Sequence, residues 1–350
     1  MRFLIFGAGA IGSLLGSRLA QAGHDVILVG RPGYVRAVQE RGLILEGGKA
    51  PGRHTVYPSA VVSLTDLPPR QCHWDMMIFT VKVYDTQEAA QELLPYVSKG
   101  MPLLIVQNGV GGEELAQQVL KEAAIISGVL TLSVSVLAPG HIRLETTRGG
   151  LNLAPTQEGI DMDQWITLFS SAGLKTAAYP NYRAMKWSKL LLNILANAIP
   201  AILGMTPGAV FAHPALFAIE RAAFLEACEV MQAMRLPVVS FPRYPVPLLV
   251  WAMRYVPAFL LRPFLMRLVA SGRGEKMPSL YLDLAGGRQR SEVSYLNGAV
   301  VTHAQRLGLD APVNRTLCGL LTRIANGQVP WEEFRGQPQQ LVRRMRDAKP

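Results

Sequence analysis

Cysteines and charged residues are both scarce in this chain. Three cysteines in 350 residues, with no CxxC pair, cannot form a disulfide framework. Charged residues make up 17 % and hydrophobic residues 49 %, which excludes an intrinsically disordered chain. These two shortages predict a folded protein of a reducing compartment, so the cytoplasm is the expected location.

Long uninterrupted apolar runs are absent as well. The most apolar region, residues 244–270, contains arginines and prolines. No segment therefore reaches the roughly 18 uncharged apolar residues of a membrane helix. The apolar N-terminal run is punctuated by glycines and lacks a clear cleavage site, unlike a signal peptide. A membrane is not expected as a partner.

Acidic residues are outnumbered by basic ones. Lys and Arg number 35 against 25 Asp and Glu, which gives a formal net charge of +10. Such a balance favours an anionic partner, which can be a nucleic acid, a membrane surface or a phosphorylated small molecule. No nucleic-acid partner is expected, because the chain has no recognised binding module and no basic run with interleaved aromatic residues.

The length predicts about two domains at roughly 150 residues each. In the first half, short apolar strands alternate with helical patterns, which is typical of an α/β Rossmann domain with a doubly wound, mostly parallel sheet. The predicted strands are residues 3–6, 26–29, 76–81, 103–107 and 125–136, and the predicted helices are 86–96 and 112–122. A hairpin is predicted over residues 131–146, around Pro139 and Gly140.

The pattern becomes helical after residue 180. One long apolar helix is predicted over 181–199, and further helical patterns cover residues 215–234, 247–269 and 291–308. We therefore expect a Rossmann domain over residues 1–180, an all-α domain over 181–335 and a polar C-terminal tail over 336–350.

A glycine motif follows the first predicted strand and opens a predicted helix. It reads Gly7-Ala8-Gly9-Ala10-Ile11-Gly12. The first glycine permits a tight turn, the second lets the backbone approach a pyrophosphate at the helix N-terminus, and the third allows close packing of helix and strand. The motif predicts a dinucleotide site, and the alternative is a glycine-rich turn without a ligand.

The second predicted strand lacks the acidic residue that usually holds the ribose of NAD. It ends in Val29-Gly30-Arg31. A guanidinium pairs well with a 2′-phosphate, so Arg31 predicts NADP(H). Lys82 follows another predicted strand, at the edge where ligands of open α/β sheets bind. For both residues the alternative is a solvated surface side chain.

Three polar residues recur every fourth position in the apolar helix. They are Lys189, Asn193 and Asn197. This spacing places them along one helix face, and burying them requires partners, which favours a face that lines a ligand site. The alternative is the one solvated face of a packed helix. Two further candidates are Glu292, which also fits a helix start, and Asn108, which also fits an Asn-Gly turn.

These motifs, in this order, resemble the ketopantoate reductase family. The likeness rests on the glycine motif, Arg31, Lys82, Gln107-Asn108-Gly109, the Lys189–Asn193–Asn197 series, residues 279–283 and residues 292–298. It implies NADPH-dependent reduction of a 2-keto acid, from ketopantoate to pantoate in pantothenate and coenzyme A synthesis. The alternatives are a related reductase of another hydroxy or keto acid, and an NADP(H)-binding regulatory or membrane-peripheral protein.

The resemblance also implies residue roles. Lys189 would protonate the ketone oxygen, and Glu292 would hold the substrate hydroxyl and help to position Lys189. The implied substrate ligands are Asn108, Asn193, Asn197 and Ser279. The glycine motif, Arg31, Lys82 and Asn108 would bind the cofactor. No metal is expected.

The chain departs from the family pattern in two places. The spacing from Asp283 to Glu292 is one residue longer, through Gly286 and Gly287. Residues 243–273 are longer and more apolar than expected, and packing in the core or in a homodimer is the default interpretation.

Overall fold

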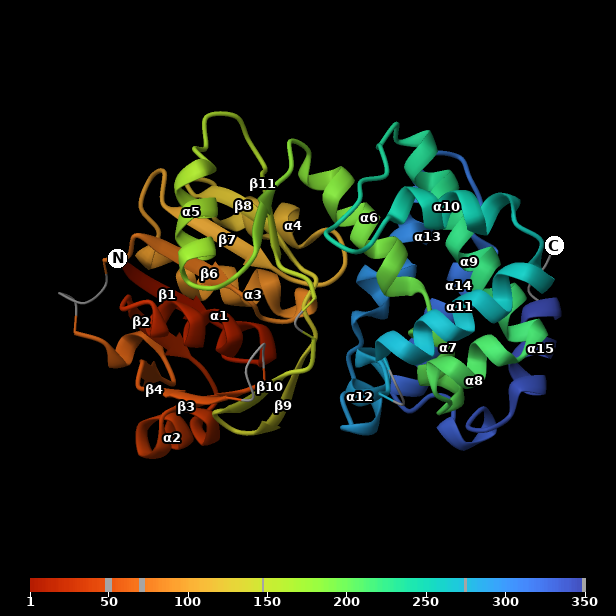
Figure 1. Ribbon diagram of the computed structural model, residues 1–350, viewed down its shortest axis with the longest axis horizontal. Coiled ribbons are helices and arrows are strands. Elements are labelled where there is room, and N and C mark those ends of the chain that lie inside the picture. Colours follow the sequence, from red (N-terminus) through yellow and green to blue (C-terminus); the bar gives the residue numbers. More distant parts are fainter. Residues whose placement is uncertain (48–51, 69–72, 147, 274–275, 348–350) are drawn as a thin grey trace. The chain divides into compact units, whose positions relative to one another are not determined.

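The computed structural model describes residues 1–47, 52–68, 73–146, 148–273 and 276–347 (Figure 1). The chain divides into two compact units. The first comprises Met1–Gln107, Gly111–Met185 and Phe241–Tyr244. The second comprises Asn108–Val110, Lys186–Ser240 and Pro245–Pro350, so three residues from the sequence of the first half belong to the second unit.

An eight-stranded sheet forms the centre of the first unit. In sheet order the strands are β12 (Thr176–Ala178), β11 (Leu151–Pro155), β8 (Ala124–Leu130), β7 (Pro102–Val106), β6 (Met76–Phe79), β1 (Arg2–Phe6), β2 (Asp25–Val29) and β5 (Ser59–Val61). Only the β8–β11 pairing is antiparallel among these described strands. The predicted fold class, a mostly parallel sheet followed by a helical region, is confirmed.

Buried residues on both faces of this sheet explain its apolar strands. Phe3 and Ile5 pack with α1 (Ala10–Gln21) and α5 (Asp163–Ser171). Leu4 and Phe6 point the other way, towards α3 (Thr86–Leu93) and α4 (Gly112–Val119). A strand that is buried on both faces reads as a continuous apolar run rather than an alternating one.

A second, four-stranded sheet lies in the same unit. Its order is β4 (Arg53–Val56), β3 (Leu43–Glu46), β10 (His141–Leu144) and β9 (Val134–Ala138). The predicted hairpin is present as the antiparallel pair β9–β10. The prediction of one strand over 125–136 is wrong, because β8 ends at Leu130 and β9 belongs to the other sheet. The remaining elements are α2 (Pro32–Arg41) and the 3₁₀ turns η1 (Leu64–Asp66), η3 (Val83–Asp85) and η4 (Leu94–Tyr96).

Helices alone make up the described part of the second unit. They are α6 (Tyr182–Ile194, which begins in the first unit), α7 (Ala198–Leu203), α8 (Pro207–Ala212), α9 (Pro214–Ala233), α10 (Val246–Tyr255), α11 (Ala258–Arg273), α12 (Ser279–Ala285), η5 (Glu292–Tyr295), α13 (Asn297–Arg306), α14 (Pro312–Ala325), η6 (Trp331–Glu333) and α15 (Pro338–Asp347). The long α9 contacts α8, α10, α11, α13, α14 and α15. It is therefore the helix around which this unit packs.

One predicted helix of the second unit needs correction. Residues 247–269 are not one helix, since α10 ends before Pro257, whose missing N–H cannot continue the helical ladder. The expected polar tail contains α15, whose Leu341 and Met345 are buried. No helix in the described ranges is long and apolar enough to span a membrane.

The predicted single helix over 181–199 is also wrong, because it breaks between α6 and α7. Ala196 has a positive φ of 50°, which no regular helix contains. Pro200 contributes to the break, since its ring would clash with the carbonyl of Ala196 in a continuous helix. In the first turn of α7 the proline is tolerated. Asn197 therefore stands at the start of α7, and only Lys189 and Asn193 share a helix.

Glu220 on α9 holds this break in place. Its carboxylate accepts a hydrogen bond from the buried N–H of Ala196 at 2.9 Å. Glu220→Leu leaves that N–H without its acceptor, so the free energy of unfolding should fall by about 1–3 kcal/mol. Urea denaturation measures the change. Glu220→Gln is the matched control because its amide oxygen can still accept, and an equal loss in both variants would contradict this role.

Candidate active site

The glycine motif forms a tight turn between β1 and α1. Gly7 has φ 108°, and a Cβ there would lie 2.7 Å from the backbone nitrogen of Val81. A Cβ at Gly12 would overlap the Gly7 carbonyl oxygen. The Gly7 carbonyl also accepts a hydrogen bond from the Thr80 hydroxyl at 2.6 Å. The first and third glycines are thus required by close packing against the chain that follows β6.

Gly9 differs from these two glycines because its surroundings are open. A Cβ at this position would meet no atom within 4 Å. Gly9 is the residue before α1, and it has no side chain to cap the first N–H groups of that helix. An uncapped helix N-terminus attracts anions. The turn therefore fits the pyrophosphate of a dinucleotide.

Arg31 is the residue before α2, and Gly30 separates it from the carboxyl end of β2. Its side chain is exposed, and the guanidinium makes no hydrogen bond or ion pair with the described residues. Tyr34, one turn further on, bonds its hydroxyl to the Ser13 hydroxyl of α1 at 2.9 Å, and burial raises the pKa of Tyr34 to about 12. The Ser13–Tyr34 bond, which the sequence did not reveal, fixes the start of α2 against α1.

Lys82 lies at the same edge of the sheet as the glycine turn. It follows β6, which pairs in parallel with β1 so that Phe79 is opposite Phe6. Gln107 at the end of β7 donates hydrogen bonds to the Val81 carbonyl and the Thr86 hydroxyl, both at 2.9 Å. The carboxyl ends of β6 and β7 are thus tied together beside Lys82.

Three of the predicted substrate ligands meet in the second unit. The Asn193 amide donates to the Asn108 side-chain oxygen at 3.5 Å. The Asn197 amide donates to the backbone carbonyl of Asn193 at 2.9 Å. Asn197 thus bonds back to α6 from the start of α7.

The cluster of Asn108, Asn193 and Asn197 is connected to the other two predicted segments. The side-chain oxygen of Asn197 accepts from the N–H of Leu280, the residue after Ser279 in α12, at 3.3 Å. The N–H of Val110 donates to the Tyr295 carbonyl of η5 at 3.1 Å. η5 begins with Glu292, which is only 3 % exposed. The loop Asn108–Val110, the break between α6 and α7, α12 and η5 are therefore joined by hydrogen bonds within the second unit.

Two lysines lie on the same helix as Asn193. Lys189 is half-buried, one turn before it. Lys186, which the sequence analysis did not single out, is buried with 4 % exposure. In the sequence, the place of this lysine between Met185 and Trp187 in an apolar helix pattern is the signal that could have identified it as buried. Among the described residues no group of three or more His, Cys, Asp or Glu could hold a metal ion.

The chain between Asp283 and Glu292 forms a closed loop. Gly287 has φ 72°, and Arg288 forms an ion pair with Asp283 at 3.2 Å while its N–H bonds the Asp283 carbonyl. The Ser291 hydroxyl caps η5 by accepting from the Val293 N–H at 3.2 Å. Ser291 thus supplies the helix-start cap that was the alternative role for Glu292.

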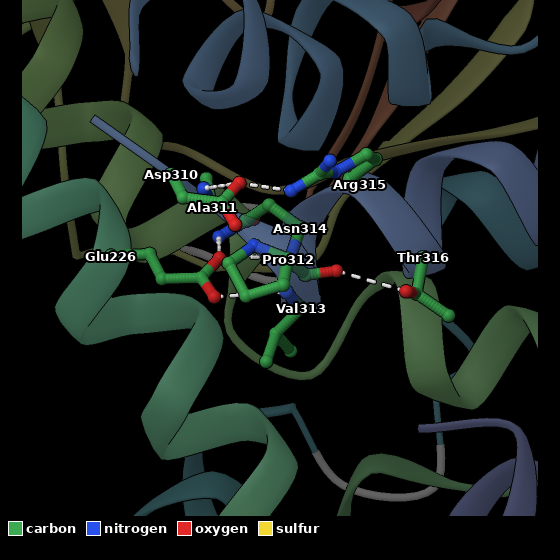
Figure 2. Close-up of polar contacts among 8 residues, drawn as sticks. All are labelled: Glu226, Asp310, Ala311, Pro312, Val313, Asn314, Arg315 and Thr316. Atoms are coloured by element: carbon green, nitrogen blue, oxygen red, sulfur yellow. Dashed lines mark hydrogen bonds and ion pairs between the residues drawn. The ribbon is translucent and has the colours of Figure 1, made fainter. Parts of the chain in front are cut away.

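A polar network joins α9 to the first turn of α14 (Figure 2). The Glu226 carboxylate of α9 accepts from the N–H groups of Val313 and Asn314, at 2.8 and 2.9 Å, and from the Asn314 amide at 2.7 Å. Asn297, the first residue of α13, donates its amide to the Asn314 side-chain oxygen at 2.8 Å. The network links α9 and α14 to the end of the segment that carries Glu292.

The chain matches the same family over two consecutive regions. Residues 3–158 match Ketopantoate reductase PanE/ApbA, and residues 181–325 match Ketopantoate reductase PanE/ApbA C terminal. The chain belongs to the ketopantoate reductase family. The 2-dehydropantoate 2-reductase of Pyrococcus horikoshii is 29 % identical over 324 residues, which are 92 % of this chain and 96 % of that protein. The enzyme of the same name from Archaeoglobus fulgidus is 29 % identical over 329 residues, 93 % and 98 % of the two chains.

Solved structures share the fold of this family member. A PanE/ApbA family ketopantoate reductase from Ralstonia eutropha JMP134 has a TM-score of 0.78 at 30 % identity, over 94 % of this chain and 99 % of that one. D-Mandelate dehydrogenase, in a ternary structure with NADH and anilino(oxo)acetate, also has a TM-score of 0.78, at 20 % identity over 93 % and 99 %. The second likeness shows the fold alone.

We expect Glu226 to make the free energy of unfolding of this chain depend on pH. Burial raises the pKa of Glu226 above its ordinary 4.5, Asp310 adds to the rise, and the hydrogen bonds from Asn314 and Val313 oppose it. The folded chain then holds this proton more tightly than the unfolded chain, so the stabilisation from protonation is complete below pH 4.5 and is lost as pH rises through the folded pKa.

We therefore expect the free energy of unfolding of the wild type to exceed that of Glu226→Gln by more near pH 4.5 than at neutral pH. Urea denaturation of both proteins across the window measures it, with the exposed Glu229→Gln on the same helix as the control. An advantage that grows with rising pH would contradict the assignment.

Proposed function

We propose that this chain is an NADPH-dependent 2-keto acid reductase that converts ketopantoate to (R)-pantoate, the step that feeds pantothenate and coenzyme A synthesis. The observation that carries the proposal is the convergence of Asn108, Asn193 and Asn197 around the break between α6 and α7, on the helix that bears Lys189. Amide groups paired in this way offer both donors and acceptors to a small hydroxylated keto acid.

Reduction of a ketone needs a hydride and a proton. Bound NADPH supplies the hydride. Lys189 carries the proton and donates it to the ketone oxygen, where its positive charge also stabilises the developing alkoxide. Asn193, Asn197 and Asn108 orient the keto acid by hydrogen bonds, and Ser279 contributes its hydroxyl from the start of α12. Glu292 holds the substrate hydroxyl and helps to position the ammonium group of Lys189.

The cofactor would be held by groups of the first unit. The N–H groups at the start of α1 bind the pyrophosphate beside Gly9, where the structure leaves room. Arg31 pairs with the 2′-phosphate, supported by its exposure and its lack of another ionic partner in the described chain. Lys82 stands beyond β6 at the ligand-binding edge of the sheet.

The general-acid role of Lys189 is tested by Lys189→Ala. We expect kcat to fall by about 100-fold or more, because that is the usual scale for losing a general acid. The dissociation constant of NADPH should stay near that of the wild type, as measured by fluorescence titration. Lys175→Ala, at an exposed lysine of the first unit, should leave kcat unchanged. An active Lys189→Ala enzyme would assign the proton to another group.

The role of Arg31 is tested by Arg31→Ala. Loss of a charge-assisted pair with the 2′-phosphate should raise KM for NADPH by about 10-fold or more, at little cost to activity with NADH. Arg36→Ala, an exposed arginine of the same helix, is the matched control. Equal losses with NADPH and NADH in Arg31→Ala would show that Arg31 does not read the phosphate.

The identity of the keto acid is a separate question, since D-mandelate dehydrogenase also shares the fold. Values of kcat/KM for ketopantoate, other branched 2-keto acids and phenylglyoxylate distinguish a ketopantoate reductase from a reductase of another keto acid. Ketopantoate should give the highest value. Cofactor binding without turnover of any keto acid would favour a regulatory protein instead.

A further inference from the structure

The short helix α7 is held by residues that come much later in the chain. It has six residues and begins directly after Asn197, one of the proposed substrate ligands. A helix of this length is not stable on its own in water, and the last four carbonyls of any helix have no partner within it. The groups that donate to these carbonyls therefore fix the place of α7 and of the Asn197 that precedes it.

Hydrogen bonds reach every one of the last four carbonyls of α7. These carbonyls belong to Pro200, Ala201, Ile202 and Leu203. The first accepts from the two N–H groups that follow the helix. The second and the third accept from the indole N–H of Trp331, at 3.1 and 2.9 Å. The last accepts from the N–H of Gly336 at 2.7 Å. Residues 331–336 thus pair all of them except the first.

Neighbouring side chains hold the indole ring of Trp331. The guanidinium of Arg335 lies over the ring, 5.1 Å from its centroid. The aliphatic part of Arg335 in turn packs against Gly204 at the end of α7, where a Cβ would lie 3.0 Å from the Arg335 Cγ. Tyr281 of α12 makes a T-shaped contact with Trp331, with ring centroids 5.5 Å apart. Trp331 therefore contacts both α7 and α12.

Helices α7 and α12 are consequently joined at two places. At the start of α7, the side-chain oxygen of Asn197 accepts from the N–H of Leu280 at 3.3 Å. Near the end of α7, Trp331 bonds the carbonyls and contacts Tyr281. Leu280 and Tyr281 directly follow Ser279, a second proposed substrate ligand. The two connections together fix Asn197 relative to Ser279.

We propose that Trp331 is a positioning residue of the substrate site, which acts through α7 and holds Asn197 against the start of α12. The inference rests on the proposed function, because it takes Asn197 and Ser279 as ligands of the keto acid. Trp331 lies beyond residue 325, where the match to the family ends. Misplacing a positioning group by about 1 Å can cost about 100-fold in rate, so the loss of this connection should be visible in the kinetics of the keto acid.

The inference is tested by Trp331→Phe, which removes the indole N–H and keeps an aromatic ring for Arg335 and Tyr281. We expect KM for ketopantoate, or for whichever 2-keto acid the wild type reduces best, to rise by about 10-fold. The change in kcat should be much smaller, because Lys189 stands on α6. The dissociation constant of NADPH should equal that of the wild type. Steady-state oxidation of NADPH and fluorescence titration measure these constants.

Trp74→Phe in the first unit is the matched control. It also removes an indole N–H from a buried tryptophan, but this N–H has no hydrogen-bond partner among the described residues. KM for the keto acid should therefore stay at the wild-type value. A wild type that reduces no keto acid would overturn the proposed function and this inference together. An active wild type whose KM is unchanged by Trp331→Phe would overturn the inference alone.

A double-mutant cycle with Asn197→Ala separates positioning from a purely structural role. If Trp331 acts through Asn197, Trp331→Phe should raise KM by less than about twofold once Asn197 is already alanine. A rise of about 10-fold in both backgrounds would show that the two residues act independently, and it would contradict the inference.

Hydrogen exchange of the wild type supplies a readout that needs no variant. Coupling between two sites is reciprocal, so saturating pantoate, bound at Asn197, should slow exchange of the backbone amides of residues 331–336. The N–H of Gly336 is the sharpest reporter, because it bonds the last carbonyl of α7. Exchange in this segment that does not respond to bound pantoate would overturn the inference.

Discussion

Polar groups buried in an apolar helical unit must find partners, and this requirement shapes the candidate site. Where α6 ends, the N–H of Ala196 bonds to Glu220, and the Asn197 amide bonds to the Asn193 carbonyl. The same turn places Asn193 beside Asn108, which the chain delivers from the end of β7. The i, i+4 spacing would keep Asn193 and Asn197 close in a continuous helix as well. The break leaves the Asn197 side chain bonded to the Asn193 carbonyl and to the Leu280 N–H.

Hydrogen bonds from this part of the chain also hold α12 and η5. Asn197 holds the start of α12 through Leu280, and Val110 holds η5 through Tyr295. Glu226 and Asn314 hold Asn297 at the start of α13. The chain that follows Glu292 is thus fixed at Tyr295 by the loop after β7 and at Asn297 by α14. Such preorganisation lets a site recognise a small polar substrate without reorganising when it binds.

Local patterns in the sequence predicted the parallel sheet and the glycine turn, because apolar strands and a strand–turn–helix unit can be read from consecutive residues. The close packing of Gly7 and Gly12 against Thr80 and Val81 could not be read in this way. The break at Ala196 was not predicted, since its partner Glu220 is 24 positions away. The Glu226–Asn314 pair, 88 positions apart, was equally invisible. For α10 and α11 the sequence left open whether the core or a second copy covers the apolar residues, because apolar periodicity indicates a packed face and does not say which molecule covers it.

The central claim is that this chain moves a hydride from NADPH to the ketone carbon of ketopantoate. Incubation of the purified protein with ketopantoate and NADPH deuterated at the transferable position, followed by mass spectrometry of the product, tests it most directly. The account predicts pantoate that carries one deuterium at the carbinol carbon. Unlabelled pantoate, or unreacted ketopantoate in the presence of a protein that binds NADPH, would contradict it.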